Sequence, residues 1–182
     1  MDYKDQLVLT GELNEIGEAM ARNVPDSYRM GVELMLGVKP CQWFQWDING
    51  TLSKNRVKNF TEKLYEDEWK NPVEVSHGNT PIAFSPDLIL NNRFSFSYRG
   101  FEAALQSQYV SKQYMSNARQ ADQTLNAYFV SNLNLAYTFK LPHVKSVTAG
   151  FTIYNLFNAE YENNGYAGSG YKIVKGEVER YN

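Results

Sequence analysis

The chain has 182 residues, with 18 Lys and Arg against 20 Asp and Glu, and its net charge of −2 excludes a broad basic field for nucleic acid or an anionic membrane surface. Hydrophobic residues make up 43% of the chain, and no run approaches the ~20 apolar residues of a spanning helix, which excludes a helical membrane protein. A transmembrane β-barrel is not excluded, because its strands alternate outward apolar with inward polar residues and give only a weak hydropathy signal.

The residue types that bind metals or form disulfides are scarce. Cys41 is the only cysteine, and His77 and His143 lie far apart in the sequence, outside any ligand-spaced pair. We therefore expect no internal disulfide, no metal site and no cofactor. Aromatic residues, in contrast, are frequent at 14%; they suit strands, and Tyr and Trp also collect at membrane interfaces.

The opening residues, Met1 to Gln6, have neither the basic nor the apolar region of a signal peptide, and the chain continues at Leu7 and Leu9 as a strand. The clearest strand follows at 28–38. One face carries apolar residues at the even positions, and the other carries polar residues or glycine, with Met35 as the exception. A helix would scatter the two sets, whereas a strand separates them.

The same period-2 pattern returns along the rest of the chain. The further segments are 44–53, 88–98, 101–109, 129–141 and 147–153. Together with the opening segment they predict about seven strands. Several run to ten or more residues, which suits a tilted crossing of a bilayer by ~9–11 residues better than the globular mode of ~5–6.

Short and long connections alternate between these strands. Short turns are expected at 39–41, 99–100 and 142–143, and long connections at 11–27, 54–86, 112–124 and after Asn158. Outer-membrane barrels have short periplasmic turns and long extracellular loops. We therefore predict an all-β fold, an antiparallel up-and-down meander that forms part of a large transmembrane β-barrel.

Polar side chains opposite the apolar stripe are the candidates for a substrate-binding lumen: Arg29, Glu33, Asp47, Arg93, Arg99 and Asn132. Alternatively, these residues only line the hydrated interior that any wide barrel needs, and we favour this interpretation for any individual residue. Aromatic residues near strand ends are the candidates for membrane-interface girdles: Tyr28, Trp43, Trp46, Tyr98, Phe101, Tyr137, Phe139 and Phe157. The carboxylates of the long connections show no spacing that selects a general acid and base, and no nucleophile elbow occurs, so we expect no enzyme.

The stretch from Val147 to Tyr161, VTAGFTIYNLFNAEY, resembles the penultimate strand of TonB-dependent outer-membrane receptors. In that family an apolar alternating strand runs into an aromatic-Asn-Leu-Phe-Asn segment followed by a Tyr. The matching residues are Tyr154, Asn155, Leu156, Phe157, Asn158 and Tyr161. The strand 130–142 and the segment from Ser27 to Glu33 add to the likeness, in family order.

The resemblance implies that residues 1–182 are a partial barrel domain from the C-terminal region of a receptor, with the signal, plug and last strand absent. It further implies energised import of a scarce nutrient (ferric siderophore, cobalamin or glycan) across the outer membrane of a Gram-negative bacterium. The implied partners are outer-membrane lipid, the rest of the barrel and plug, the TonB complex, and a small nutrient ligand, with no nucleic acid.

Two alternatives stay open. One is a complete small outer-membrane barrel acting as a pore or adhesin, which a hidden eighth strand around Tyr171–Val174 would support. The other is a soluble carbohydrate-binding β-sandwich.

Overall fold

The computed structural model describes the whole chain apart from residues 15, 67–69, 169, 175–176 and 182. All regular elements in this described part are β-strands. In the same part of the chain there is no helix that is long and apolar enough to cross a membrane.

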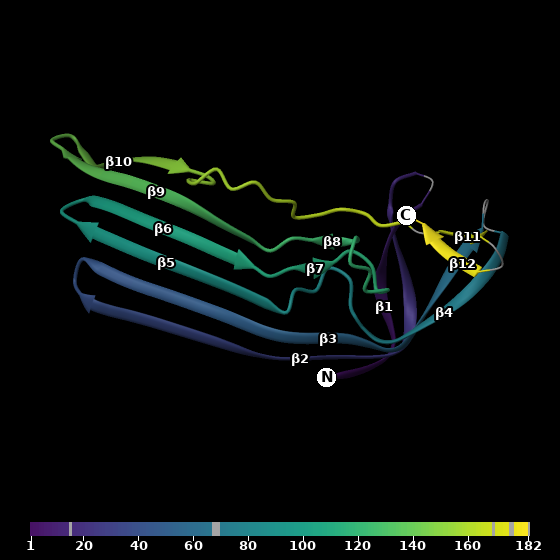
Figure 1. Cartoon of the computed structure of the whole chain (residues 1–182). Coiled ribbons are helices and arrows are strands. Elements are labelled where there is room, and N and C mark those ends of the chain that lie inside the picture. Colours follow the sequence, from purple (N-terminus) through teal and green to yellow (C-terminus); the bar gives the residue numbers. More distant parts are fainter. Residues whose placement is uncertain (15, 67–69, 169, 175–176, 182) are drawn as a thin grey trace.

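The main sheet is an antiparallel meander in the order β1-β2-β3-β5-β6-β9-β10 (Figure 1). Its strands are β1 (Asp2–Leu13), β2 (Ala19–Cys41), β3 (Phe44–Glu66), β5 (Leu88–Tyr98), β6 (Phe101–Val110), β9 (Tyr128–Leu141) and β10 (Val144–Ile153). Each of the seven predicted segments lies in one of these strands, so the predicted meander is confirmed. Five further strands lie off this path: β4 (Lys70–Pro81), the β7–β8 pair (Gln113–Tyr114, Thr124–Leu125) and the β11–β12 hairpin (Gly170–Val174, Glu177–Tyr181).

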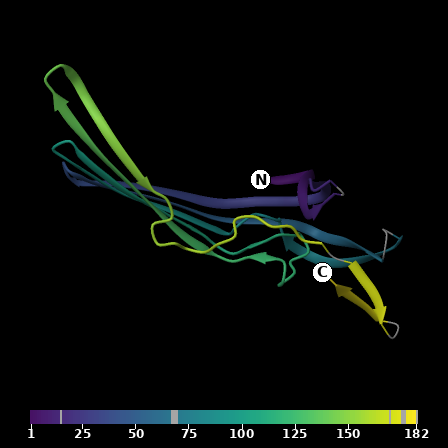
Figure 2. The same ribbon diagram turned by 90° about the horizontal axis from the view of Figure 1, so that it is seen from above.

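The short turns lie at one end of the sheet, whereas the long connections, β4 and the β11–β12 hairpin lie toward the other (Figures 1 and 2). Two of the predicted turns are confirmed, at 99–100 and 142–143. Arg99 and Gly100 both have positive φ, 49° and 84°, as a tight two-residue hairpin turn requires. The third was misplaced: Lys39, Pro40 and Cys41 belong to β2, and the turn residues are Gln42 and Trp43.

The strands are longer than the apolar pattern predicted. β2 and β3 have 23 residues each, a length of about 75 Å. The apolar core of a bilayer is only about 30 Å thick, so both strands continue well beyond one crossing. The expected long connections 11–27 and 54–86 are therefore mostly strand. The sequence did not reveal these extensions because their two faces are both largely polar.

The extensions form a second structural region, the loop-end cap. β1 pairs with β2 from Ala19 to Tyr28, and β4 pairs with β3 from Arg56 to Glu66. A small hydrophobic core joins these two ribbons, formed by Val8, Val24, Val57, Phe60, Ile82 and Ala118. We call the remainder of the sheet, from about Arg29 on β2 to the end of β10, the wall.

The possible eighth strand does form, but it does not extend the wall. β11 pairs with β12, and its contact with β3 is one parallel bridge between Gly170 and Tyr65. It lies beside the cap, away from the edges at β2 and β10. The described residues therefore form an open sheet and not a small closed barrel.

Candidate functional site

The two faces of the wall differ in chemistry. Cross-strand partners point to the same face of a sheet, and the register places Leu34 opposite Gly50 and Glu33 opposite Thr51. The apolar face is open: Val32 is 60% exposed, Leu34 71% and Phe151 64%. A water-soluble sheet buries such a face against another layer. Among the described residues no layer covers it.

The polar face carries a row of side chains across four neighbouring strands. Asp47 on β3 lies opposite Arg93 on β5, Arg93 opposite Gln106 on β6, and Gln106 opposite Asn132 on β9. Gln45 Nε2 donates to both carboxylate oxygens of Asp47 at 2.9 and 3.0 Å, and Arg93 Nε donates to Ser95 Oγ at 3.2 Å. Within the described part of the chain no ion pair joins Asp47 to Arg93, so both charges remain available to a further group.

A ladder of amides runs beside this row on the same face. Asn91 Nδ2 donates to Asn49 Oδ1 and Gln108 Nε2 donates to Asn91 Oδ1, both at 2.9 Å. Row and ladder together line a shallow trough on the polar face. The alternation in the sequence already placed Gln106 in the polar row opposite the apolar stripe, whereas Asn91 and Gln108 become recognisable as members of the trough only once the register is known.

The other predicted lumen residues lie apart from this trough. Arg29 and Glu33 are on the polar face of β2, opposite Asn55 and Thr51. Arg99 occupies the turn between β5 and β6, with its guanidinium 5.2 Å from the centroid of the Tyr98 ring. The structure thus brings together three of the named candidates, Asp47, Arg93 and Asn132, and not the others.

Most of the predicted interface aromatics gather near the short turns. Trp43 stacks on Phe96 with ring centroids 6.0 Å apart, and Tyr137 meets Phe139 edge-on at 4.7 Å. Tyr98 lies opposite Phe101, and Phe101 lies opposite Tyr137. These aromatic side chains therefore form a continuous belt across β5, β6 and β9. Trp46 lies farther along β3, where its ring stacks on Phe94 at 6.0 Å.

Two predicted aromatics lie away from this belt. Tyr28 is at the far end of the apolar stripe, and Phe157 is 67% exposed beyond β10. The ten residue-to-residue steps from Tyr28 to Val38 correspond to about 33 Å of strand, or about 25 Å of height at a 40° tilt. This height matches the apolar band of an outer-membrane barrel.

The segment Tyr154 to Tyr161 forms a latch at the end of β10. Asn155 and Asn158 have positive φ, 49° and 51°, a conformation that asparagine tolerates better than most residues. The Asn155 side chain forms two hydrogen bonds with the backbone of Ala159: Oδ1 accepts from Ala159 N at 2.9 Å, and Nδ2 donates to Ala159 O at 3.0 Å. Asn155 N donates to Asn132 Oδ1 at 2.8 Å, so Asn132 also holds the latch.

The last residue of this motif packs on the start of β9. The Tyr161 ring stacks on Tyr128, with centroids 4.4 Å apart and planes 20° from parallel. Burial, helped by the neighbouring Tyr161, raises the pKa of the Tyr128 hydroxyl. The aromatic and asparagine positions of the motif therefore have a structural explanation, namely a turn that folds back onto β9.

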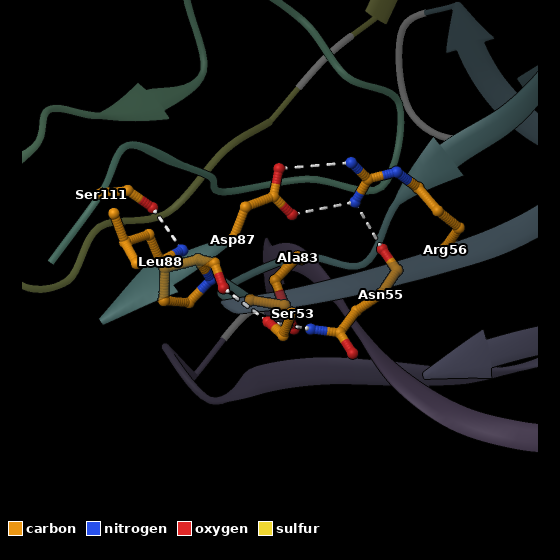
Figure 3. A network of polar contacts seen from close by, with 9 residues as sticks. Ser53, Asn55, Arg56, Ala83, Asp87, Leu88 and Ser111 are labelled. Atoms are coloured by element: carbon orange, nitrogen blue, oxygen red, sulfur yellow. Dashed lines mark hydrogen bonds and ion pairs between the residues drawn. The ribbon is translucent and has the colours of Figure 1, made fainter. Parts of the chain in front are cut away.

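A polar network fastens the connection between β4 and β5 to β3 (Figure 3). The Arg56 guanidinium binds both Asp87 carboxylate oxygens at 3.3 Å, and Ser53 Oγ donates to Pro86 O at 3.0 Å. The connection after β6 joins in, because Ser111 Oγ accepts from Leu88 N at 3.0 Å. These bonds fix the long connections to the rim of the wall.

The buried side-chain amide of Asn117 connects the loops to the cap in a similar way. Asn117 Oδ1 accepts from Ala83 N at 2.8 Å, and Asn117 Nδ2 donates to Leu9 O at 2.7 Å. Asn117 is 1% exposed. It links three segments that are distant in sequence, and no local pattern in the sequence marks it.

Groups that hold metals do not gather in the described part of the chain, where no three His, Cys, Asp or Glu residues form a potential site. The site is therefore a surface: a polar trough, an apolar exterior and ordered loop-end connections.

Comparison with known proteins identifies this arrangement. The model of the TonB dependent receptor-like β-barrel family matches residues 1–156. Among solved structures, the ferric yersiniabactin uptake receptor FyuA from Yersinia pestis is similar in fold, with a TM-score of 0.59 and 20% identity over 82% of this chain. The chain spans 21% of the length of that receptor. No curated protein matches. On the match over residues 1–156, the chain belongs to the family of TonB-dependent receptor-like β-barrels.

Proposed function

We propose that this chain forms part of the wall, lumen lining and extracellular loops of a TonB-dependent outer-membrane transporter that imports a scarce nutrient into a Gram-negative cell. The single observation that carries the proposal is the two-faced wall. Its apolar face is exposed over a height that fits the bilayer, and its opposite face is polar. Outer-membrane lipid then covers the apolar face, and the short turns lie in the periplasm.

The open edges of the wall support the view that it works within a larger barrel. In lipid, every backbone polar group needs a partner, so an open sheet edge is not viable in a membrane. Among the described strands, the part of β2 from Met30 to Cys41 pairs only with β3, and β10 pairs only with β9. We assign the missing partners to the rest of the barrel, and the contact with the TonB complex to the plug side of the parent.

The polar trough is the surface that faces the lumen in this proposal. Its amides and the charges of Asp47 and Arg93 face either the plug or a passing nutrient. Ferric siderophore, cobalamin and glycan remain the nutrient classes, because the trough offers donors, acceptors and both signs of charge.

Growth under nutrient limitation tests the proposal. Cells that lack the intact protein are grown with a ferric siderophore as the iron source, with cobalamin limiting, or with an oligosaccharide as the carbon source. We expect a growth defect in one of these media, none in rich medium, and the same defect in cells without a working TonB complex. Normal growth of the deleted strain in all three media would contradict nutrient import of these classes.

No specific observation favours the small outer-membrane barrel or the carbohydrate-binding β-sandwich. A sandwich requires a second sheet packed on the apolar face, and the described residues provide none. A small barrel requires a strand that joins β10 to β2, whereas β11 lies beside the cap.

A further inference from the structure

A pocket of about 180 Å³ lies in the loop-end cap, at the fork where β2 and β3 part. The last pair between these two strands is Ser27 with Val57, beyond which β2 continues with β1 and β3 continues with β4 (Figure 1). The connection after β6 covers the fork, because Ser116 and Ala118 from that connection also line the pocket. Phe60 and Ala118 belong to the core of the cap as well. This fork pocket therefore adjoins the cap core and is separate from the trough of the wall.

Arg22 on β2 bridges the fork and brings hydrogen-bond donors to the pocket. Its Nη2 donates to Thr61 O at 2.9 Å, and its guanidinium lies 4.8 Å from the centroid of the Phe60 ring. These two contacts hold the side chain between β2 and β3. A guanidinium has five N–H donors, and within the described part of the chain Arg22 belongs to no ion pair. Arg22 can therefore donate further hydrogen bonds to a ligand in the pocket.

Polar side chains that are already held in place supply acceptors to the same pocket. Ser116 Oγ donates to Gln123 Oε1 at 2.7 Å, and both residues are buried. Thr10 Oγ1 on β1 donates to Met20 O at 3.2 Å. A hydroxyl oxygen has two lone pairs, so Ser116 and Thr10 can still accept a hydrogen bond after donating their own. The fork pocket therefore offers fixed acceptors as well as the donors of Arg22.

The charges in the lining of the pocket balance. Glu12 and Glu62 are acidic, whereas Arg22 and Lys63 are basic. Glu62 Oε2 lies 2.8 Å from His77 Nε2, and Lys63 forms an ion pair with a carboxylate on β4. An ion that enters the pocket therefore meets no excess of opposite charge to offset the loss of its hydration. The lining favours a neutral ligand with hydroxyl groups, because each hydroxyl both donates and accepts.

The size of the pocket limits this ligand to a single small ring. Pockets for drug-sized ligands measure about 300–1,000 Å³, and a ferric siderophore or cobalamin is at least as large as such ligands. Met20, Phe60 and Ala118 add apolar surface to the lining, which suits the C–H groups of a sugar ring.

We propose that the fork pocket binds one neutral sugar unit of a glycan, with Arg22 as the donor and Thr10 and Ser116 as acceptors. This inference rests on the proposed function, in which the loop-end cap faces the cell exterior. Among the three nutrient classes it selects the glycan, so the growth defect of the deleted strain is expected on the oligosaccharide medium.

Saturation-transfer difference NMR of the intact protein in detergent tests the pocket. Glucose, galactose and mannose are each compared with their uronic acid and their 2-amino sugar, which carry one negative or one positive charge on the same ring. We expect at least one neutral sugar to bind with a millimolar dissociation constant, as suits a ligand of so few atoms. It should bind at least about tenfold more tightly than its two charged counterparts. Failure of all three neutral sugars to bind, or equal or tighter binding of a charged form, would overturn the proposal.

Two pairs of variants locate the bound sugar. Arg22→Gln removes the guanidinium donors and should weaken binding at least about tenfold. Its matched control, Arg119→Gln, changes an exposed arginine of the covering connection that does not line the pocket, and should leave binding unchanged. Met20→Trp fills the pocket and should abolish binding, whereas Met20→Leu conserves the volume and should retain it.

The Met20 pair leaves the bond between Arg22 and Thr61 in place, so it also decides the case in which Arg22→Gln does not fold. Equal losses in Arg22→Gln and Arg119→Gln, or full binding by Met20→Trp, would each overturn the proposal.

The growth test separates failure of this inference from failure of the proposed function. If only the fork pocket is wrong, the deleted strain keeps its growth defect in one of the three media, and the intact protein binds no neutral sugar. If the proposed function is wrong, the deleted strain grows normally in all three media, and the binding measurement still decides the pocket.

Discussion

The wall and the loop-end cap are built from the same two long strands, yet they bury apolar side chains in opposite ways. In the wall, Leu34 and its neighbours on β2 face outward and remain open, whereas in the cap Val57 and Phe60 on β3 are 0% and 6% exposed. Val57 shares the polar face of the wall, since it lies opposite Ser27 in the register that continues to Val38. β3 therefore has an open apolar face on one side in the wall and contributes to a protein core on its other side in the cap.

The transition between the two regions is visible in β2. Val24 and Ser27 are three residues apart, and both are buried. Strict alternation would put them on opposite faces, so the alternation breaks at Pro25 and Asp26. Asp5, the neighbour on β1, has a positive φ of 51° at the same level. This irregularity moves the even positions of β2 from the apolar face of the wall to the core of the cap.

The largest difference is expected from removing the same side chain in the two regions. Leu64 is 3% exposed in the cap, and Leu64→Ala should cost about 2–5 kcal/mol, because a cavity remains in the core. Leu34→Ala in the wall should cost at most about 2 kcal/mol, because lipid fills the space. Denaturant unfolding of the intact protein in lipid vesicles measures both. A larger loss in Leu34→Ala would contradict the assignment of the two regions.

Placing an arginine on either face of the wall compares the two faces directly. Leu34→Arg should cost about 2–4 kcal/mol, the penalty for a cation at the middle of a lipid-facing strand. Its neighbour Glu33→Arg places the same side chain on the polar face and should change the unfolding free energy by less than about 0.5 kcal/mol. The same vesicle-based unfolding gives both values, and equal penalties would mean that the two faces are not distinguished by lipid.

The latch provides a smaller, local effect. Asn155→Gly keeps the positive φ but loses the two side-chain bonds to Ala159, whereas Asn155→Ala loses the bonds and also strains the backbone by about 1–2 kcal/mol. We expect Asn155→Ala to be less stable than Asn155→Gly by about that amount. Asn158→Gly, which keeps the favourable φ, is the control and should be nearly neutral. The order would be contradicted if alanine and glycine at position 155 were equally stable.

The smallest effect concerns an ion pair at the junction between wall and cap. Lys58 Nζ donates to Asp2 Oδ1 at 2.9 Å; this bond lowers the pKa of Asp2 from 3.8 and raises that of Lys58 from 10.5. The contribution of Asp2 is therefore present above pH 3.8 and lost as the pH falls below it. The contribution of Lys58 is present below pH 10.5 and lost as the pH rises above it.

Comparison of Asp2→Asn with the unaltered protein across pH tests this pair. The difference in unfolding free energy should be small and constant between these limits, because water reaches both groups and screens the pair, and should vanish in acid. A difference that persists undiminished below the lowered pKa of Asp2 would contradict the assignment.

The sequence predicted the wall better than the cap, for a physical reason. The wall has one apolar and one polar face, and this strict alternation made the strands around Leu34 and Leu135 recognisable. β4 has no such stripe, because among the described strands it pairs with β3 in the cap and not in the wall. Met35, the exception in the pattern, does lie on the polar face, opposite Asn49.

The trough was only partly predictable. The tight Arg99–Gly100 turn fixes the register of β5 and β6 and so places Arg93 opposite Gln106, which a register argument from the sequence would have found. The displaced turn at Gln42–Trp43 would have misaligned β2 with β3 in the same argument. Asn117 reaches Leu9 across 108 positions, and no local propensity encodes such a contact.

Cysteine labelling at two adjacent positions tests the two-faced wall most directly. In a Cys41→Ser background, Glu33→Cys and Leu34→Cys are introduced into the intact protein, which is then reconstituted in lipid vesicles. A water-soluble maleimide should label position 33 and leave position 34 unlabelled, whereas a lipid-soluble maleimide should label position 34. Equal labelling of both positions by the water-soluble reagent would contradict a lipid-covered apolar face, and with it the barrel-wall function.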